Sequence, residues 1–220
     1  MNIFALMTSS KESGLGMTIA AKLLDIGAIK LSVEKPFTWS SGWKSPIYCD
    51  NRLSLSYPEL RTLIKTALSQ AIRKEFPEAE AIAGVATAGI PQGALVADEM
   101  GLPFLYVRSK PKGHGMENLI EGKIDLDQKV VVVEDLISTG GSSLKAAAAL
   151  QKAEAKVLGM AAIFTYGFDL ASENFKAAEI PIFCLSNYEY LIKVALEREY
   201  IKEDQQETLR SWRADPAAWG

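Results

Sequence analysis

Two hydrophobic patterns alternate along this chain: short apolar runs, and longer segments in which apolar residues lie three or four positions apart. Short apolar runs typical of buried strands lie at residues 80–86, 103–107, 129–134, 155–164 and 181–185. Apolar residues three or four positions apart, typical of one helix face, recur at residues 18–29, 57–76, 91–100, 142–153, 169–178 and 186–196. Strands that alternate with helices form a parallel sheet with helices on both faces, so the pattern predicts an α/β fold.

Local signals refine three of these elements. Four consecutive valines at residues 130–133 leave no polar face, which is typical of a central strand. Pro58 suits the first turn of the helix at residues 57–76. Ser186 and Glu189 have the spacing of a capping box, so we expect the last of the six helices to begin at Ser186.

The chain of 220 residues fits one α/β domain. The first fifty or so residues do not follow the alternation, and we expect them to form a smaller piece at about residues 15–56, beside a core at about residues 57–200. A terminal helix is expected at about residues 201–214. A long polar connection at residues 109–128 separates two strands, and connections of this length are usually functional or disordered.

Charge and composition exclude several classes of protein. With 24 basic and 27 acidic residues the formal charge is −3, which argues against nucleic-acid binding driven by net charge. The two cysteines, Cys49 and Cys184, have no metal-site spacing and fit a reducing cytosol. No apolar window approaches the ~20 residues of a membrane span. We therefore expect a soluble cytoplasmic protein with no nucleic-acid or membrane partner.

The candidate chemistry lies directly after the valine strand. Glu134 and Asp135 come at its carboxyl end, where α/β sheets bind ligands, and a loop rich in Ser, Thr and Gly follows at residues 136–143. Backbone amides and the hydroxyls of this loop could surround one phosphate at the start of the next helix. The contributing hydroxyls would be those of Ser138, Thr139, Ser142 and Ser143.

The loop reads Gly-Gly-Ser where a Walker loop has Gly-Lys-Ser or Gly-Lys-Thr. One phosphate in the loop and a polyhydroxyl group on the two acids match ribose 5-phosphate. The alternative is that Glu134 and Asp135 only end a strand and cap the next helix.

The order of residues at 130–141, an apolar run, two acids, two apolar residues and Ser-Thr-Gly-Gly, resembles the phosphoribosyl diphosphate (PRPP) signature of type I phosphoribosyltransferases. Three further segments resemble the orotate phosphoribosyltransferases within that family. Residues 37–52 are similar to their N-terminal hood, residues 84–91 to their diphosphate-binding turn, and residues 108–115 to their mobile catalytic loop. The resemblance covers roughly residues 37–196, in the family's order.

This resemblance implies a type I phosphoribosyltransferase core with a small N-terminal hood. It also implies transfer of the 5-phosphoribosyl group of PRPP to N1 of orotate, giving orotidine 5′-monophosphate and diphosphate in de novo pyrimidine (UMP) biosynthesis. A homodimer with shared active sites is expected, with Mg²⁺ as cofactor and no dedicated protein ligand set. Mg²⁺ would be held through PRPP, with Glu134 and Asp135 as the candidate protein contacts.

The resemblance also assigns roles to residues of this chain. The expected catalytic residues are Lys112, His114, Glu134 and Asp135. The expected PRPP-binding residues are Ala86, Thr87, Ala88, Arg108, Lys112, His114, Glu134, Asp135, Leu136, Ile137, Ser138, Thr139, Gly140, Gly141 and Ser142. The expected orotate-binding residues are Tyr48, Cys49, Arg52 and Ser138.

The chain also departs from the best-known form of the family. Ser40 stands where that form has a hood lysine, and the diphosphate turn has Thr87 and Ala88 where that form has Tyr-Lys. Members often have a cis peptide in this turn, which would lie between Ala86 and Thr87.

The arginine that meets the orotate carboxylate is absent after the strand at residues 155–164. Arg52 is our candidate for that role and Lys44 is the reserve. Arg52 could instead form a surface ion pair with Asp50 or Glu59.

A cationic lid over diphosphate is suggested by four residues in the long connection: Arg108, Lys110, Lys112 and His114, the chain's one histidine. The same residues could instead form a solvated basic loop.

Two functional alternatives stay open. A phosphoribosyltransferase for a purine base would keep the PRPP loop and need a different hood. A PRPP-binding regulator would keep the fold without the chemistry.

Overall fold

A computed structural model describes residues 4–6, 10–39, 42–110 and 119–219 of the protein. Its centre is a seven-stranded sheet, in the order β1-β11-β10-β9-β6-β7-β8. The strands are β1 (Phe4–Leu6), β6 (Ala81–Val85), β7 (Phe104–Val107), β8 (Ile120–Glu121), β9 (Lys129–Ile137), β10 (Lys156–Thr165) and β11 (Ile182–Asn187). All neighbours are parallel except β7 and β8, which confirms the predicted α/β fold.

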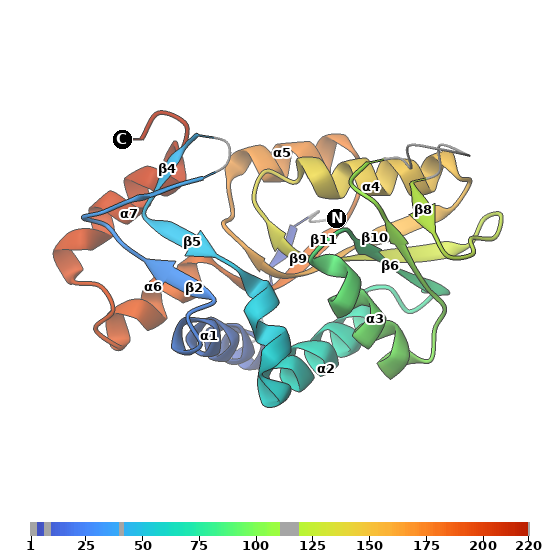
Figure 1. The fold of residues 1–220 in the computed structure, drawn as a ribbon, viewed down its shortest axis with the longest axis horizontal. Helices are drawn as coiled ribbons and strands as arrows, with labels where there is room; N and C mark the ends of the chain where they lie inside the picture. Colours follow the sequence, from blue (N-terminus) through green and yellow to red (C-terminus); the bar gives the residue numbers. More distant parts are fainter. Residues whose placement is uncertain (1–3, 7–9, 40–41, 111–118, 220) are drawn as a thin grey trace.

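Helices cover both faces of this sheet (Figure 1). Helices α4 (Gly141–Lys152) and α5 (Asp169–Ala177) lie on one face, and α1 (Ser10–Asp25), α2 (Pro58–Glu75) and α3 (Gly89–Met100) lie on the other. The valines of β9 explain why both faces need cover. Val131 and Val133 belong to the apolar cluster with α1 and α2, whereas Val130 and Val132 belong to the cluster with α4 and α5. Alternate side chains of a strand point to opposite faces, so four valines in a row supply two cores.

The N-terminal hood lies at one end of the sheet (Figure 1). It contains two short antiparallel pairs, β2 (Ile29–Leu31) with β5 (Ile47–Cys49) and β3 (Phe37–Thr38) with β4 (Lys44–Ser45). The 3₁₀ helix η1 (Asn51–Ser56) leads from β5 into α2. The C-terminal elements α6 (Tyr188–Glu197), η2 (Glu203–Gln205) and α7 (Gln206–Ala214) lie at the same end, and the Trp212 indole N–H donates to the Lys44 carbonyl over 3.2 Å.

The structure corrects four details of the predicted elements. The helix expected at residues 18–29 is α1 (Ser10–Asp25), and Ile29 instead begins β2. Ser186 does not begin a helix: it is buried in β11 and donates to the Gly16 carbonyl, while Asn187 caps α6 by accepting from the Tyr190 amide. Glu134 and Asp135 do not end their strand, because β9 continues to Ile137. The connection at residues 109–128 contains strand β8. In the described part of the chain, no helix is both long and apolar enough to cross a membrane.

Candidate active site

The two acids lie where one neighbour of β9 has ended and the other continues. Strand β6 pairs with β9 only as far as Gly84 opposite Val133, whereas β10 pairs with it as far as Thr165 opposite Ile137. Beyond Val133, α3 approaches closely: a Cβ on Gly89 would lie 2.5 Å from the Val133 carbonyl oxygen. The backbone of Glu134 and Asp135 therefore lies past the last β6 pair, at the carboxyl end of the sheet, which is the ligand position typical of α/β sheets.

Hydrogen bonds hold the Glu134 carboxyl group in place, and burial perturbs the pKa of both acids. Glu134 is 5% exposed; its Oε1 accepts from the Asp135 amide over 3.1 Å and its Oε2 from the Ser143 hydroxyl over 3.2 Å. Burial raises the pKa of Glu134 well above its ordinary value, and the neighbouring charge of Asp135 raises it further. Burial also raises the pKa of Asp135. A pair of this kind is poised to accept hydrogen bonds from ligand hydroxyls, and its perturbed titration is typical of functional sites.

The loop after β9 leads into the N-terminus of α4, and its backbone is fixed from two sides. Gly140 has φ of +81° at the N-terminus of α4, and a Cβ there would lie 2.6 Å from the Phe175 ring, so only glycine fits. The Asn174 side chain of α5 donates to the Thr139 carbonyl over 3.0 Å and fixes the loop from outside. The Ser143 hydroxyl is directed to Glu134, so our grouping of Ser143 with the phosphate hydroxyls was wrong. Ser138, Thr139 and Ser142 remain as the candidate phosphate contacts.

One cavity of about 630 Å³ joins this loop to the hood. Its size is typical of small-molecule sites, which range over roughly 300–1,000 Å³. The lining residues are Thr38, Trp39, Trp43, Tyr48, Cys49, Leu136, Ser138, Thr139 and Tyr166. Loop hydroxyls and flat aromatic rings therefore share one space, as a ligand with a phosphate and a planar base would require.

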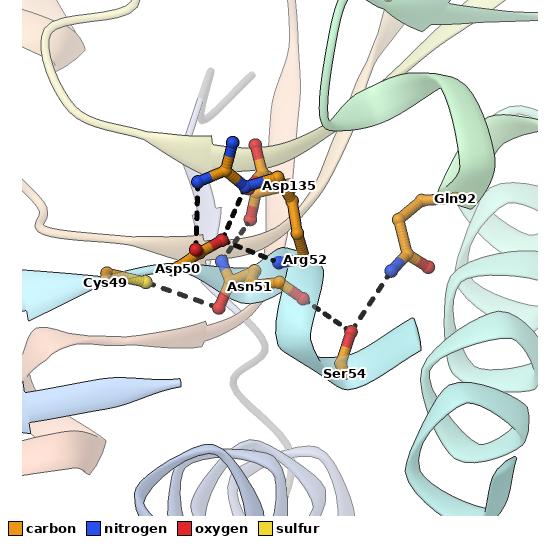
Figure 2. Close-up of polar contacts among 7 residues, drawn as sticks. All are labelled: Cys49, Asp50, Asn51, Arg52, Ser54, Gln92 and Asp135. Carbon is orange, nitrogen blue, oxygen red and sulfur yellow. Dashed lines mark hydrogen bonds and ion pairs between the residues drawn. The ribbon is translucent and has the colours of Figure 1, made fainter. Parts of the chain in front are cut away.

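Two hood cations lie near this cavity, and both have partners. Arg52 forms a two-point ion pair with Asp50, with Nε to Oδ1 at 2.6 Å and an Nη to Oδ2 at 2.9 Å (Figure 2). This is the surface ion pair that we considered as the alternative for Arg52; contact with orotate stays a prediction. The Lys44 ammonium donates over 2.9 Å to the hydroxyl of Thr38, a cavity residue.

The diphosphate turn has the cis peptide expected between Ala86 and Thr87. The Ala86 amide donates to the Val107 carbonyl over 2.9 Å, so of the three expected PRPP-binding residues of this turn only Thr87 and Ala88 could offer a backbone N–H to diphosphate. Arg108 forms an ion pair with Glu121 of β8 at 3.2 Å. Lys112 and His114, like Ser40 in the hood, lie outside the described residues.

Comparison with known proteins agrees with this geometry. The family model "Phosphoribosyl transferase domain" matches residues 55–188. The orotate phosphoribosyltransferase of Cytophaga hutchinsonii is 61% identical over 201 residues, covering 91% of this chain and 96% of that protein. The orotate phosphoribosyltransferase of Porphyromonas gingivalis is 56% identical over 94% of this chain and 98% of that protein.

The chain belongs to the orotate phosphoribosyltransferase family.

Solved members of this family share the fold at lower identity. The orotate phosphoribosyltransferase of Aeropyrum pernix is 26% identical, with a TM-score of 0.73 over 84% of this chain and 99% of that chain. The orotate phosphoribosyltransferase of Mycobacterium tuberculosis, solved in complex with PRPP, is 23% identical, with a TM-score of 0.62 over 82% of this chain and 99% of that chain.

Several contacts that shape the site were not predicted from the sequence. Asn174 supports the loop at residues 136–142, named the phosphate loop after its predicted ligand, Asn51 contacts Asp135 from 84 positions away, and Trp212 contacts the hood from 168 positions away. No periodicity marks these three residues, and only Asn51 lies in a segment that carries the family resemblance, residues 37–52. For Trp212 the signal in the sequence was its size: the largest apolar residue of the helix expected at residues 201–214 is the one expected to pack against the rest of the protein.

Proposed function

We propose that this protein transfers the 5-phosphoribosyl group of PRPP to N1 of orotate, giving orotidine 5′-monophosphate and diphosphate in UMP biosynthesis. The observation that carries the proposal is the single cavity that Ser138 and Thr139 of the phosphate loop share with Tyr48 and Cys49 of the hood. It has room for a ribose phosphate and a pyrimidine side by side. The names of the relatives at 61% and 56% identity support the same reaction.

The reaction breaks the bond between C1 of the ribose and the diphosphate oxygen, and it forms a bond from C1 to N1 of orotate. Positive charge develops on the ribose and negative charge on the leaving diphosphate, so catalysis depends mainly on placed charges and dipoles. Glu134 and Asp135 would accept hydrogen bonds from the ribose hydroxyls. The loop from Leu136 to Ser142, at the N-terminus of α4, would bind the 5′-phosphate.

Mg²⁺ is proposed to enter with PRPP. In the described part of the chain, no group of three or more His, Cys, Asp or Glu side chains could hold a metal ion. Both oxygens of Glu134 already accept hydrogen bonds, so Asp135 is the better placed of the two acids for a metal contact. When bound, Mg²⁺ would neutralise charge on the diphosphate, and most of its ligands would be PRPP oxygens and water.

The catalytic lid is proposed to act across a homodimer, with Lys112 and His114 of one subunit over the diphosphate of the other. A mixture of Lys112→Ala and Asp135→Asn chains tests this arrangement. In the Lys112→Ala homodimer both sites lack a working lid, and in the Asp135→Asn homodimer both lack the carboxylate. A hybrid dimer has one site that combines an intact lid with an intact carboxylate. At full subunit exchange roughly a quarter of wild-type activity should return. If mass measurement shows exchange and activity does not return, the lid serves its own subunit.

The orotate carboxylate needs a cation, and Arg52 remains our candidate with Lys44 in reserve. Loss of a charge-assisted hydrogen bond costs about 1.5–3 kcal/mol, which corresponds to a roughly ten- to hundredfold rise in KM for orotate. Arg52→Ala should show that rise, with little change in KM for PRPP. Because Asp50 holds Arg52 in this structure, Asp50→Asn should lower KM for orotate if Arg52 must be released to bind it. Lys44→Ala tests the reserve in the same assay.

The assay itself is loss of orotate absorbance with PRPP and Mg²⁺ present. Adenine, guanine and hypoxanthine in parallel test the purine-base alternative. Turnover of a purine and not of orotate would replace the proposed substrate. PRPP binding without turnover of any base would indicate a regulator.

A further inference from the structure

Asn51 joins the hood to the strand that carries the two acids. It is the first residue of η1 and is 1% exposed. Its side-chain amide donates to the Asp135 carbonyl over 2.7 Å, and its side-chain oxygen accepts from the Cys49 thiol over 3.3 Å. Figure 2 shows the Asn51 side chain between these two residues. One buried side chain thus contacts both a residue of the cavity wall and a ribose-binding acid.

The Asp135 carbonyl needs this donor because its strand neighbour has ended. In β9 the Lys129 carbonyl faces the β6 side, where it accepts from the Glu80 amide. Carbonyls two residues apart face the same side of a strand, so that of Asp135 also faces β6. The last β6 pair, however, is Gly84 with Val133. Asn51 supplies the N–H that β6 no longer offers to this partly buried carbonyl.

The same segment reaches the helix that follows the diphosphate turn. The Ser54 hydroxyl donates to the Asn51 carbonyl over 2.6 Å, and the Gln92 side chain of α3 donates to the Ser54 oxygen over 3.2 Å (Figure 2). Burial and the charges of Asp135 and Asp50 raise the pKa of Cys49, so its thiol keeps the proton that it donates. This chain of hydrogen bonds therefore links Cys49 of the cavity wall, the backbone of Asp135 and helix α3.

We propose that Asn51 is a positioning residue: it fixes the backbone of Asp135 relative to Cys49, and so sets the ribose carboxylate at the right distance from the base. This inference rests on the proposed function and adds a residue to it. Asn51 is 1% exposed and does not line the cavity, so its role is exerted through Asp135 and Cys49.

Two substitutions separate positioning from simple packing. Asn51→Asp keeps the shape and the acceptor for Cys49, but it turns an oxygen instead of an N–H toward the Asp135 carbonyl. Asn51→Ala removes both contacts. A displacement of the order of 1 Å can cost about 10²-fold in rate, so kcat should fall about that far in Asn51→Asp. The kcat of Asn51→Ala should fall less, because alanine places no second oxygen against the Asp135 carbonyl.

A matched control is Ser69→Ala. Ser69 is fully buried in α2 and donates to the Lys65 carbonyl over 2.9 Å, away from the cavity. This variant also loses a buried hydrogen bond, and it should lose thermal stability without loss of kcat. If Asn51 were merely structural, its variants would behave like Ser69→Ala at a temperature well below their unfolding transitions.

Wild-type turnover is measured first, so that the two proposals fail separately. Without orotate-dependent turnover in the wild type, the proposed function is wrong. With it, the positioning role is overturned if folded Asn51→Asp and Asn51→Ala keep kcat within about twofold of wild type. If neither variant folds, Asn51→Ser takes their place: its hydroxyl is too short to reach the Asp135 carbonyl, so a wild-type kcat there would refute the role.

Discussion

Replacing Trp212 should show that the C-terminal helix supports the base side of the cavity. The Trp212 ring is fully buried, and it lies 5.7 Å from the rings of both Trp39 and Tyr166 in edge-to-face contact. Trp39 and Tyr166 line the cavity. Since Trp212 also donates to the Lys44 carbonyl, helix α7 contacts the hood hairpin at both a ring and a backbone group.

The size of the effect follows from these contacts. Truncation of a buried Trp to Ala typically costs about 3–5 kcal/mol. For a chain of this length, 1 kcal/mol lowers Tm by roughly 2–4 °C, so Trp212→Ala should lower Tm by roughly 6–20 °C. Trp212→Phe keeps a ring and loses the indole hydrogen bond, which contributes about 0.5–1.5 kcal/mol. KM for orotate should rise in both variants, and more in Trp212→Ala.

KM for PRPP should change little, because the phosphate loop is held by Asn174 of α5 and not by α7. Thermal unfolding and steady-state kinetics, measured well below each transition, test both expectations. Ile72→Ala is the control: Ile72 is fully buried in α2, so this variant should lose stability without a change in either KM. An equal rise of both KM values in Trp212→Ala, or unfolding at the wild-type temperature, would refute the reasoning.

Three further substitutions test the carboxylate and the loops around it. Asp135→Asn should lower kcat by about 10²-fold or more while Tm stays near the wild-type value, because the lost charge acts where the ribose becomes positive; normal turnover would end this assignment. Gly140→Ala should weaken PRPP binding and lower Tm, since its Cβ would collide with the Phe175 ring at a left-handed φ. Gly89→Ala should push α3 away from the Val133 carbonyl, and unchanged kcat in that variant would show that the close approach is dispensable.

Sequence patterns predict those features of the protein whose residues lie close together along the chain. The valine run of β9, the two acids and the small-residue loop lie within fourteen positions, and their order alone indicated a phosphate site on a central strand. The error at Ser186 has the same local origin. Its spacing to Glu189 fits a capping box, but β11 continues through Asn187 because Ser186 is buried against Gly16.

Contacts between distant segments left no such signal. Asn51 is an ordinary polar residue until the fold brings it to a carbonyl that β6 cannot reach. Ser143 was grouped with the phosphate hydroxyls because all of them follow the acids in sequence, yet the first turn of α4 directs it back to Glu134. In both cases the partner is set by where neighbouring strands and helices end, and periodicity does not encode those ends.

A last prediction concerns the balance between stability and function at Glu134. Its pKa is raised in the folded protein, chiefly by burial, so the folded chain holds this proton more tightly than the unfolded chain does. Below the ordinary Glu pKa both states are protonated, and the contribution of Glu134 to stability is fully present. As pH rises through that value and then through the raised folded value, the contribution is lost, because a charged carboxylate is forced into a buried site.

Glu134→Gln removes this titration and keeps an oxygen that can accept from the Asp135 amide and an N–H that can meet the Ser143 hydroxyl. Without PRPP or Mg²⁺, its Tm should therefore exceed that of the wild type at pH 8, and the difference should shrink as pH falls toward 4. Each unit of pKa difference between the folded and unfolded states corresponds to about 1.4 kcal/mol, so thermal unfolding resolves even a modest shift. Turnover should be strongly reduced at the same time. A Tm difference that does not depend on pH would mean that Glu134 ionises as easily in the folded protein as in the unfolded chain. The burial of its carboxylate would then not destabilise the folded protein, and hydrogen bonds from the ribose hydroxyls would have no such destabilisation to offset.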